Sequence, residues 1–121
     1  MNSILAQDFA NYEVITIDDG STDNSGKICD RYSLLDSRIR SIHTSNRGVS
    51  AARYLGVKES RGNYICFIDS DDEFDKSMLE TVYEVVSKNS CDLLIFGMQK
   101  FLLIIIKLFS RNQIIVSMNI G

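Results

Sequence analysis

Three carboxylates stand within four residues at the end of a short apolar run. The run is Tyr64–Ile68, and the acids after it are Asp69, Asp71 and Asp72. Its length and its β-branched and aromatic content predict a buried strand, so the acids emerge where that strand meets a loop. Carboxylates this close repel one another and favour a compensating cation. Oxygen ligands of this kind suit Mg²⁺ or Mn²⁺, with a diphosphate completing the coordination shell.

A second acidic pair, Asp18 and Asp19, follows another apolar run, Val14–Ile17. Two acidic strand ends in one α/β chain suggest a single site built from both. The alternative is that these are ordinary turn and helix-capping residues, because Asp and Ser are common at both places. The sequence favours the shared site for the pair of clusters taken together.

Strand and helix patterns alternate through most of the chain. The predicted strands are 13–18, 38–43, 64–69 and 92–98, and the predicted helices are 25–35, 49–60 and 76–88. The first helix carries Ile28, Tyr32 and Leu35 at helical spacing. This alternation predicts an α/β fold, a mostly parallel sheet with helices on both faces and ligands at the carboxyl ends of the strands. We divide the chain into a domain over residues 1–100 and an apolar segment, 101–121, whose structure the pattern does not define.

Composition narrows the class of protein. The chain has 121 residues, 45% of them hydrophobic, and a net charge of −3, which fits one globular domain. No Lys/Arg tract is present, so we expect no nucleic-acid partner. Three scattered cysteines indicate reduced thiols and a cytoplasmic protein, and no signal peptide is visible. We expect the single histidine, His43, to be structural or to lie on the surface.

The apolar stretch 101–109 is too short to span a bilayer. A core or edge strand is its favoured role. Peripheral association with a membrane, at its inner face, is the alternative that the pattern leaves open.

A third motif lies between the two acidic clusters, over Asn46–Arg53. Gly48 opens a predicted helix, and the small residues after it let that helix approach a sheet or a ligand closely. Arg53 lies one turn further on, where a guanidinium is able to bind a phosphate or a base edge with paired hydrogen bonds. A solvated arginine on an amphipathic helix is the alternative.

These motifs together resemble family 2 inverting glycosyltransferases. Asn2–Asp23 is similar to the start of that family, Asn46–Gly56 to its Asn-x-Gly-x-Ser-x-Ala-Arg segment and Phe67–Asp72 to its Asp-x-Asp motif. The resemblance covers about residues 2–100, with order and spacing in agreement. It implies a Rossmann-like nucleotide-diphospho-sugar transferase fold. It also implies a UDP-sugar or similar donor, with transfer to an acceptor hydroxyl in glycan or polysaccharide synthesis.

The resemblance also implies roles for individual residues. Asp19 matches the acid that hydrogen-bonds the base, Arg53 a basic residue near the nucleotide and Asp69 an acid near the ribose and metal. Asp71 matches the ligand of Mn²⁺ or Mg²⁺, with Asp72 beside it. The acceptor, a glycan or lipid-linked glycan, is not specified by these motifs.

Two departures from the family pattern affect the expected activity. Family members begin with a strand that carries a Pro-Val-Tyr-Asn-like motif, whereas Met1 falls inside the helix that follows it. The family's general base comes well after the Asp-x-Asp motif, and residues 101–121 contain no matching motif. We therefore expect a fragment of the nucleotide-binding half of a hexosyltransferase-type enzyme, lacking one central strand and a catalytic base. Such a chain would have low or no activity alone.

Two other functions fit parts of the pattern. A phosphorylation-receiver domain also places acids at two strand ends, and Asp18, Asp19, Asp69 and Lys100 imitate that arrangement. It leaves Asn46–Arg53 without a role and crowds the acceptor with Asp71 and Asp72. A non-catalytic remnant that binds a nucleotide, or nothing, is the second alternative.

Overall fold

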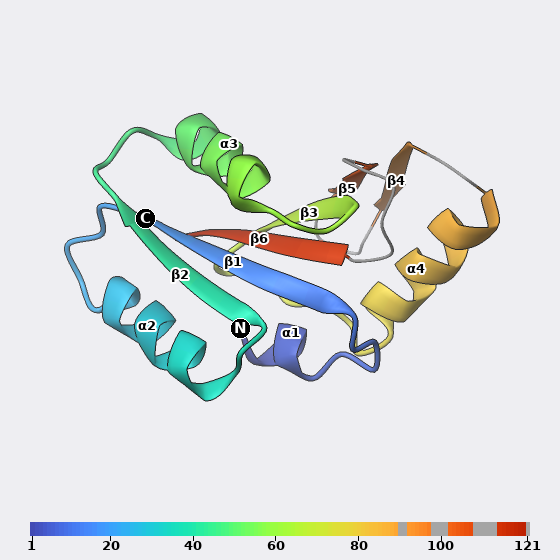
Figure 1. Ribbon diagram of the computed structural model, residues 1–121, viewed down its shortest axis with the longest axis horizontal. Helices are drawn as coiled ribbons and strands as arrows, with labels where there is room; N and C mark the ends of the chain where they lie inside the picture. The colour runs from blue at the N-terminus through green and yellow to red at the C-terminus, as the bar shows by residue number, and fades with distance from the viewer. Residues whose placement is uncertain (90–91, 98–101, 108–113, 121) are drawn as a thin grey trace.

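The computed structural model describes residues 1–89, 92–97, 102–107 and 114–120, with side chains for 1–89 and 92–95. Six strands in these residues form one sheet in the order β2-β1-β6-β3-β5-β4 (Figure 1). They are β1 (Tyr12–Asp19), β2 (Ile39–Thr44), β3 (Tyr64–Asp69), β4 (Leu93–Gly97), β5 (Leu102–Lys107) and β6 (Ile114–Ile120). The pairs β2–β1, β1–β6 and β6–β3 are parallel, whereas β5 is antiparallel to both β3 and β4. The predicted α/β fold with a mostly parallel sheet is confirmed.

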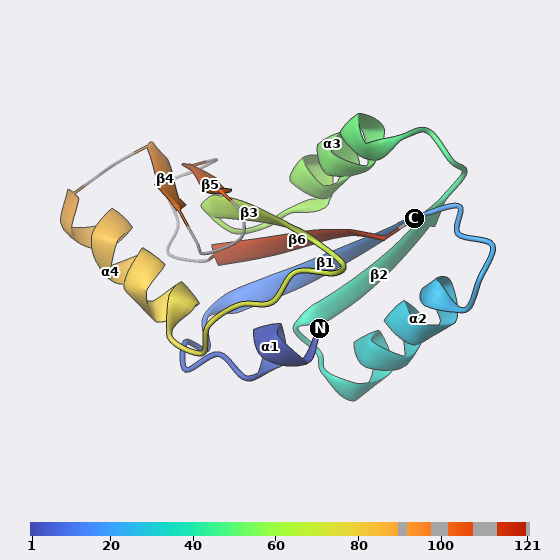
Figure 2. The ribbon, with the colours of Figure 1, turned by 180° about the vertical axis from the view of Figure 1, so that it is seen from behind.

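Helices cover both faces of the sheet, as predicted. They are α1 (Asn2–Leu5), α2 (Ser25–Leu35), α3 (Val49–Glu59) and α4 (Met78–Asn89). In Figures 1 and 2, α3 lies on one face, and the other three helices lie on the opposite face. Alternate residues of β1 feed the two cores, with Val14 packed on the side of α4 and Ile15 on the side of α3. Burial on both faces explains why the strands read as continuous apolar runs.

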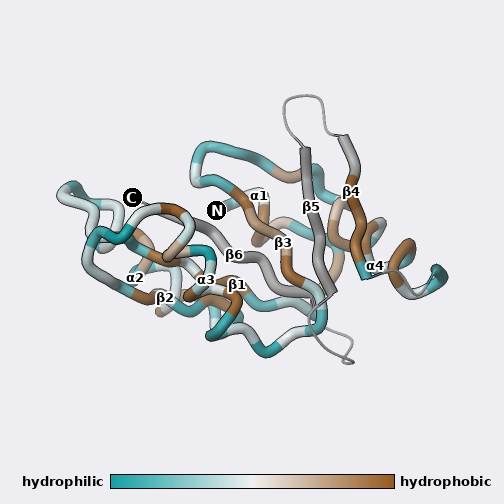
Figure 3. Tube along the Cα trace, turned by 90° about the horizontal axis from the view of Figure 1, so that it is seen from above, coloured by the Kyte–Doolittle hydropathy of each residue, from teal (hydrophilic) through white to brown (hydrophobic). Residues whose placement is uncertain are grey.

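The helical patterns differ in how well they predict burial. Met78, Leu79, Val82 and Val86 of α4 are buried, in agreement with the predicted face. Figure 3 shows the hydrophobic stretches of α4 and β4 side by side. For α2 the apolar spacing does not mark the buried face, because Ile28 and Leu35 are exposed and Tyr32 is only partly buried, whereas the buried residues are Gly26 and Cys29. Small residues on that face let α2 lie close to β1, which leaves its larger apolar side chains outside.

Strand β6 occupies the position in which we expected a gap. It lies between β1 and β3, pairing Tyr12–Asp18 of β1 with Ile114–Ile120, and Tyr64–Asp69 of β3 with Ile114–Asn119. The central position is therefore filled from the carboxyl-terminal part of the chain. β5, in the segment that we favoured as a core or edge strand, lies inside the sheet between β3 and β4. Among the described helices, none combines the length and apolar character needed to cross a membrane.

Candidate functional site

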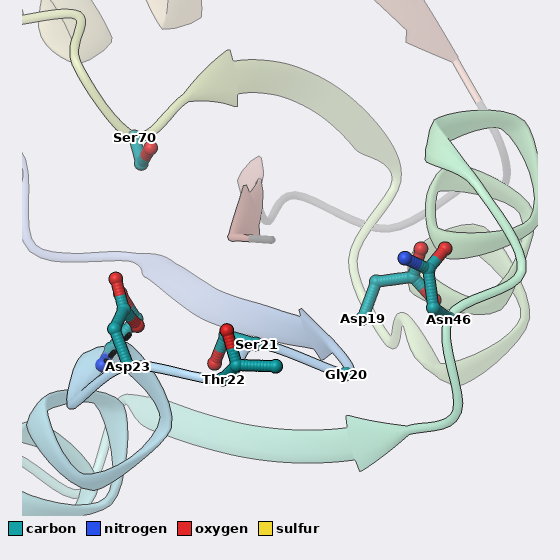
Figure 4. A pocket seen from close by; sticks show the side chains of 8 residues that line it. Asp19, Gly20, Ser21, Thr22, Asp23, Asn46 and Ser70 are labelled. Atoms are coloured by element: carbon teal, nitrogen blue, oxygen red, sulfur yellow. Dashed lines mark hydrogen bonds between the residues drawn. The ribbon is translucent and has the colours of Figure 1, made fainter.

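The carboxyl ends of β1 and β3 lie at one edge of the sheet, because both strands run parallel to β6. A pocket of about 450 Å³ opens at this edge (Figure 4). Its lining comes from the loop after β1, from the loop after β2 and from the end of β3. The lining residues are Asp19, Gly20, Ser21, Thr22, Asp23, Ser25, Asn46 and Ser70. The structure thus brings the two acidic strand ends to one edge, as the sequence predicted.

Asp19 is a buried carboxylate in the wall of this pocket, only 6% exposed. Its Oδ1 accepts a hydrogen bond from the backbone N–H of Arg47, and its Oδ2 accepts one from the N–H of Gly48, both at 2.9 Å. Asp19 therefore ties the end of β1 to the start of α3. Each carboxylate oxygen has a further lone pair with which to accept a hydrogen bond from a base. That hydrogen bond remains a prediction.

Gly20 allows the loops after β1 and β2 to approach each other. Its φ is +74°, and a Cβ there would lie 2.8 Å from the backbone nitrogen of Asn46. Both the left-handed conformation and the close backbone neighbour require glycine at this position. The close approach explains how Asn46, from the loop after β2, comes to line the pocket with Gly20.

His43 bridges two carboxylates beside the pocket. Its Nδ1 lies 2.9 Å from Oδ2 of Asp18, and its Nε2 lies 2.7 Å from Oδ1 of Asp30. Hydrogen bonds to Asp18 and then to Asp30 raise the pKa of His43 above its ordinary value. Burial works to raise the pKa of Asp18, but hydrogen bonds from Ser21 and His43 outweigh it and hold that pKa low. The sequence predicted that His43 is structural or lies on the surface. Its side chain is 47% exposed and is also hydrogen-bonded to two carboxylates.

The second acidic strand end is far more open. The side chain of Asp69 is 59% exposed and lies 3.6 Å from the guanidinium of Arg53, which projects from α3. Asp71 is exposed, and the N–H of Asp72 donates to the carbonyl of Asp69 in a turn. The structure brings together Arg53 and Asp69, two residues that the sequence assigned to one nucleotide site.

No group of three His, Cys, Asp or Glu side chains among the described residues is gathered closely enough to hold a metal ion. The donor set at the end of β3 still suits Mg²⁺ or Mn²⁺. Such ions commonly take one or two carboxylates, with phosphate oxygens and water as the other ligands. The exposed acids Asp69 and Asp71, with Asp72 beside them, are of that kind.

The sequence reasoning missed several residues of the pocket. Ser21, Thr22 and Asn46 line it, but only their acidic neighbours were chosen as site residues. A signal was present in the glycine after each acidic or polar group, Gly20 after Asp19 and Gly48 after Asn46 and Arg47. Glycines at such positions mark loops whose backbone, as well as side chains, builds a binding surface.

Residues 1–103 match the sequence profile of the family described as Glycosyl transferase family 2. This chain belongs to glycosyl transferase family 2. The match agrees with the resemblance seen in the three motifs and with the α/β fold, and it decides against the phosphorylation-receiver alternative. Lys100, on which that alternative relied, lies outside the described residues.

Curated members of the family are similar to most of this chain. Glycosyltransferase GlyG of Streptococcus pneumoniae serotype 4 is 44% identical over 93 residues, covering 76% of this chain and 31% of GlyG. Glycosyltransferase GlyA of the same strain is 39% identical over 101 residues, or 84% of this chain and 14% of GlyA. The uncharacterized glycosyltransferase EpsJ of Bacillus subtilis strain 168 is 39% identical over 83% of this chain and 29% of EpsJ. The chain thus spans less than a third of the length of each of these relatives.

Proposed function

We propose that this chain binds the nucleoside diphosphate part of a nucleotide-sugar donor, with UDP as the favoured nucleotide. The observation that carries the proposal is the pocket at the carboxyl edge of the sheet. Asp19 forms part of its wall, and Ser70, between Asp69 and Asp71, forms another part. Membership of a glycosyltransferase family supports a donor of this class. The sugar and the acceptor glycan are outside what the pocket specifies.

Each proposed contact follows from the charge and exposure of the group involved. Arg53 is 46% exposed beside Asp69, so its guanidinium is accessible to a phosphate oxygen. Asp19 offers carboxylate oxygens that are able to accept a hydrogen bond from an N–H of the base. The backbone of the loop after β1 supplies polar groups around the rest of the nucleotide.

The acids after β3 are the proposed holders of Mn²⁺ or Mg²⁺. Asp71 is the principal ligand, with Asp69 and Asp72 as its partners, in keeping with the exposure of Asp69 and Asp71 and the partial exposure of Asp72. A bound divalent ion would offset the negative charge that develops on the departing diphosphate. Arg53 would add a fixed positive charge on the same side of the pocket.

Calorimetry with UDP, in the presence and absence of Mn²⁺, tests this proposal. We expect metal-dependent binding that Asp71→Ala weakens by about tenfold or more, which corresponds to about 1.4 kcal/mol. Glu80→Ala is the matched control, because it removes an equal charge from an exposed position in α4. Binding that needs no metal and survives Asp71→Ala would remove Asp71 from the site. No binding at all would favour the non-catalytic remnant.

The 121-residue chain alone is expected to transfer sugar far more slowly than a complete enzyme. Positioned base assistance typically contributes on the order of 10²- to 10⁴-fold to such reactions, and positioning of the acceptor contributes more. The sequence after Asp72 contains no recognisable base motif. Rapid turnover of a nucleotide-sugar onto a defined acceptor would show that the chain contains a base that we have not identified. The predicted cytoplasmic location and the peripheral membrane contact remain predictions.

A further inference from the structure

We propose that His43 is a positioning residue for the donor pocket, acting through Asp18 on the loop after β1. The inference rests on the proposed nucleotide binding, and it adds a residue that contacts neither the pocket nor any predicted ligand. His43 is on β2, Asp18 on β1 and Asp30 on α2, so one side chain joins three elements.

The first step runs from the pocket to Asp18. Oδ1 of Asp18 accepts a hydrogen bond of 3.0 Å from the backbone N–H of Ser21, and Ser21 lines the pocket. Oδ2 of the same carboxylate faces His43 at 2.9 Å. The two oxygens of Asp18 therefore connect the imidazole to the pocket wall, and a rotation of this carboxylate would release the Ser21 amide.

The second step concerns packing around Asp18. Asp18 is 7% exposed, and a Cβ added to Gly26 would lie 2.5 Å from its Oδ2. Helix α2 thus closes over the carboxylate at a residue that has no side chain. Gly26 and His43 therefore confine Oδ2 of Asp18 between them, and the orientation that they set is transmitted through Oδ1 to the Ser21 amide.

The third step concerns the charge of the imidazole. A neutral imidazole has one N–H donor, whereas both ring nitrogens of His43 face carboxylate oxygens. Only the imidazolium donates to Asp18 and Asp30 together. Among the side chains that the structure describes, these two acids, from β1 and α2, are the charged groups that face His43, and the nearby Ser41 on β2 is neutral. The raised pKa of His43 agrees with this arrangement.

Loss of the imidazolium proton of His43 has two consequences, and both weaken nucleotide binding. One of the two carboxylates then faces a ring lone pair, which loosens the bridge. The end of β1 and the loop after it, which carry Asp18, Asp19 and Asp23, also lose a compensating positive charge, so a diphosphate in the pocket meets a more negative surface. Both effects weaken binding of the nucleotide as the pH rises through the pKa of His43.

UDP binding in the presence of Mn²⁺, measured from pH 6 to pH 9 on the full chain, tests the inference. We expect His43→Gln to bind UDP about three- to tenfold more weakly than the wild type at low pH, where hydrogen bonds to charged groups contribute most. The difference should shrink as the wild-type imidazole loses its proton. Leu34→Ala is the control, since it removes an exposed side chain from α2 without touching the bridge.

Nuclear magnetic resonance separates this inference from nucleotide binding itself. In the wild type without ligand, the Ser21 amide shift should follow the titration of His43, with a pKa above the ordinary value of about 6.5. Asp30→Asn, at an exposed partner, should lower that pKa and so serves if His43→Gln fails to fold. A Ser21 amide that ignores His43, or equal UDP affinity of wild type and His43→Gln at every pH, would overturn the inference. If UDP binds at no pH, the proposed function fails while the titration still decides the role of His43.

Discussion

The two acidic strand ends of this protein look alike in sequence and differ in structure. At the end of β1, Asp18 and Asp19 are 7% and 6% exposed, and their oxygens accept hydrogen bonds from three backbone amides and from His43. At the end of β3, the Asp69 side chain is 59% exposed, and its ion pair with Arg53 spans 3.6 Å. Asp18 and Asp19 thus fix the backbone of the loops that follow β1 and β2, whereas the carboxylate of Asp69 remains accessible to solvent.

This difference shows that a carboxylate at the end of a strand can either stabilise the fold or bind a ligand. Buried oxygens that accept amide hydrogen bonds fix the shape of loops, because leaving those amides unpaired would be costly. Exposed oxygens contribute little to folding and are free to bind an ion. The pocket needs both kinds, one to shape its wall and one to hold its ligand.

The largest test of this comparison sets Asp19→Ala against Asp71→Ala. We expect Asp19→Ala to lower the free energy of unfolding by about 2–4 kcal/mol, because the amides of Arg47 and Gly48 lose their acceptors. Asp71→Ala should change it by less than about 0.5 kcal/mol. Urea denaturation of both variants measures the two changes in the free energy of unfolding. Equal changes would show that Asp19 stabilises the fold no more than Asp71 does.

A second test crowds the first strand end without removing a charge. Gly26→Ala should lower the free energy of unfolding by about 1–3 kcal/mol, since the added methyl would meet Oδ2 of Asp18 at 2.5 Å. Gly48→Ala is the comparison, because its φ of +90° carries a conformational penalty while its surroundings are open. We expect about 1–3 kcal/mol for that variant, because its φ of 90° with a ψ of 164° is a backbone conformation that is nearly confined to glycine. Thermal unfolding measures both variants, and a Gly26→Ala chain as stable as the wild type or more so would show that crowding at Asp18 does not matter, because alanine is otherwise favoured over glycine within a helix.

A third test uses pH to find where titration affects folding. The pKa of Asp18 is lowered in the folded chain, so its contribution to stability is present above about pH 4 and is lost as the pH falls through its folded pKa. The pKa of His43 is raised, so its contribution is complete below about pH 6.5 and is lost as the pH rises through its folded pKa. Urea unfolding from pH 3 to pH 9 should therefore show a decline on both sides. His43→Gln should remove its part of the alkaline decline, and an unchanged profile would contradict the bridge.

The smallest expected effect is at the second strand end. Arg53→Gln should change the free energy of unfolding by less than about 0.5 kcal/mol, because the Arg53 and Asp69 side chains are 46% and 59% exposed. The same variant should weaken UDP binding if Arg53 meets a phosphate. Thermal unfolding and calorimetry on one preparation compare the two effects. A loss of stability larger than the loss of affinity would assign Arg53 to the architecture.

Much of the fold could be predicted from local patterns, and the exceptions have physical reasons. The apolar run Tyr64–Ile68 predicts a strand, and the periodic apolar residues of α4 predict a helix. Both predictions succeed because the buried residues follow the apolar pattern of each element. The burial of α2 was not predictable in this way, since Gly26 and Cys29 approach β1 and leave Ile28 outside. The position of β6 depends on pairing with residues about a hundred positions earlier, which no local window contains.

The site shows the same division between local and distant information. Asp19, Arg53 and Asp69 could be chosen from motifs, because acids after strands and a basic residue after a glycine are visible along the chain. The bridge of His43 could not be predicted. It depends on how the register of β2 against β1 places residue 43 opposite residue 18, and on where α2 then brings Asp30.

The position of β6 also sets when the middle of this sheet can form during synthesis. Tyr12 in β1 pairs with Ile114 in β6, and Tyr64 in β3 pairs with the same residue on its other side. At about 5–20 residues per second, a nascent chain would hold β1 without this neighbour for roughly 5–20 s. Contacts of such long sequence separation slow folding, and the edge of β1 stays open to other strands meanwhile. The nascent chain therefore passes through a period in which chaperones, or aggregation, compete with the pairing of β1 and β6.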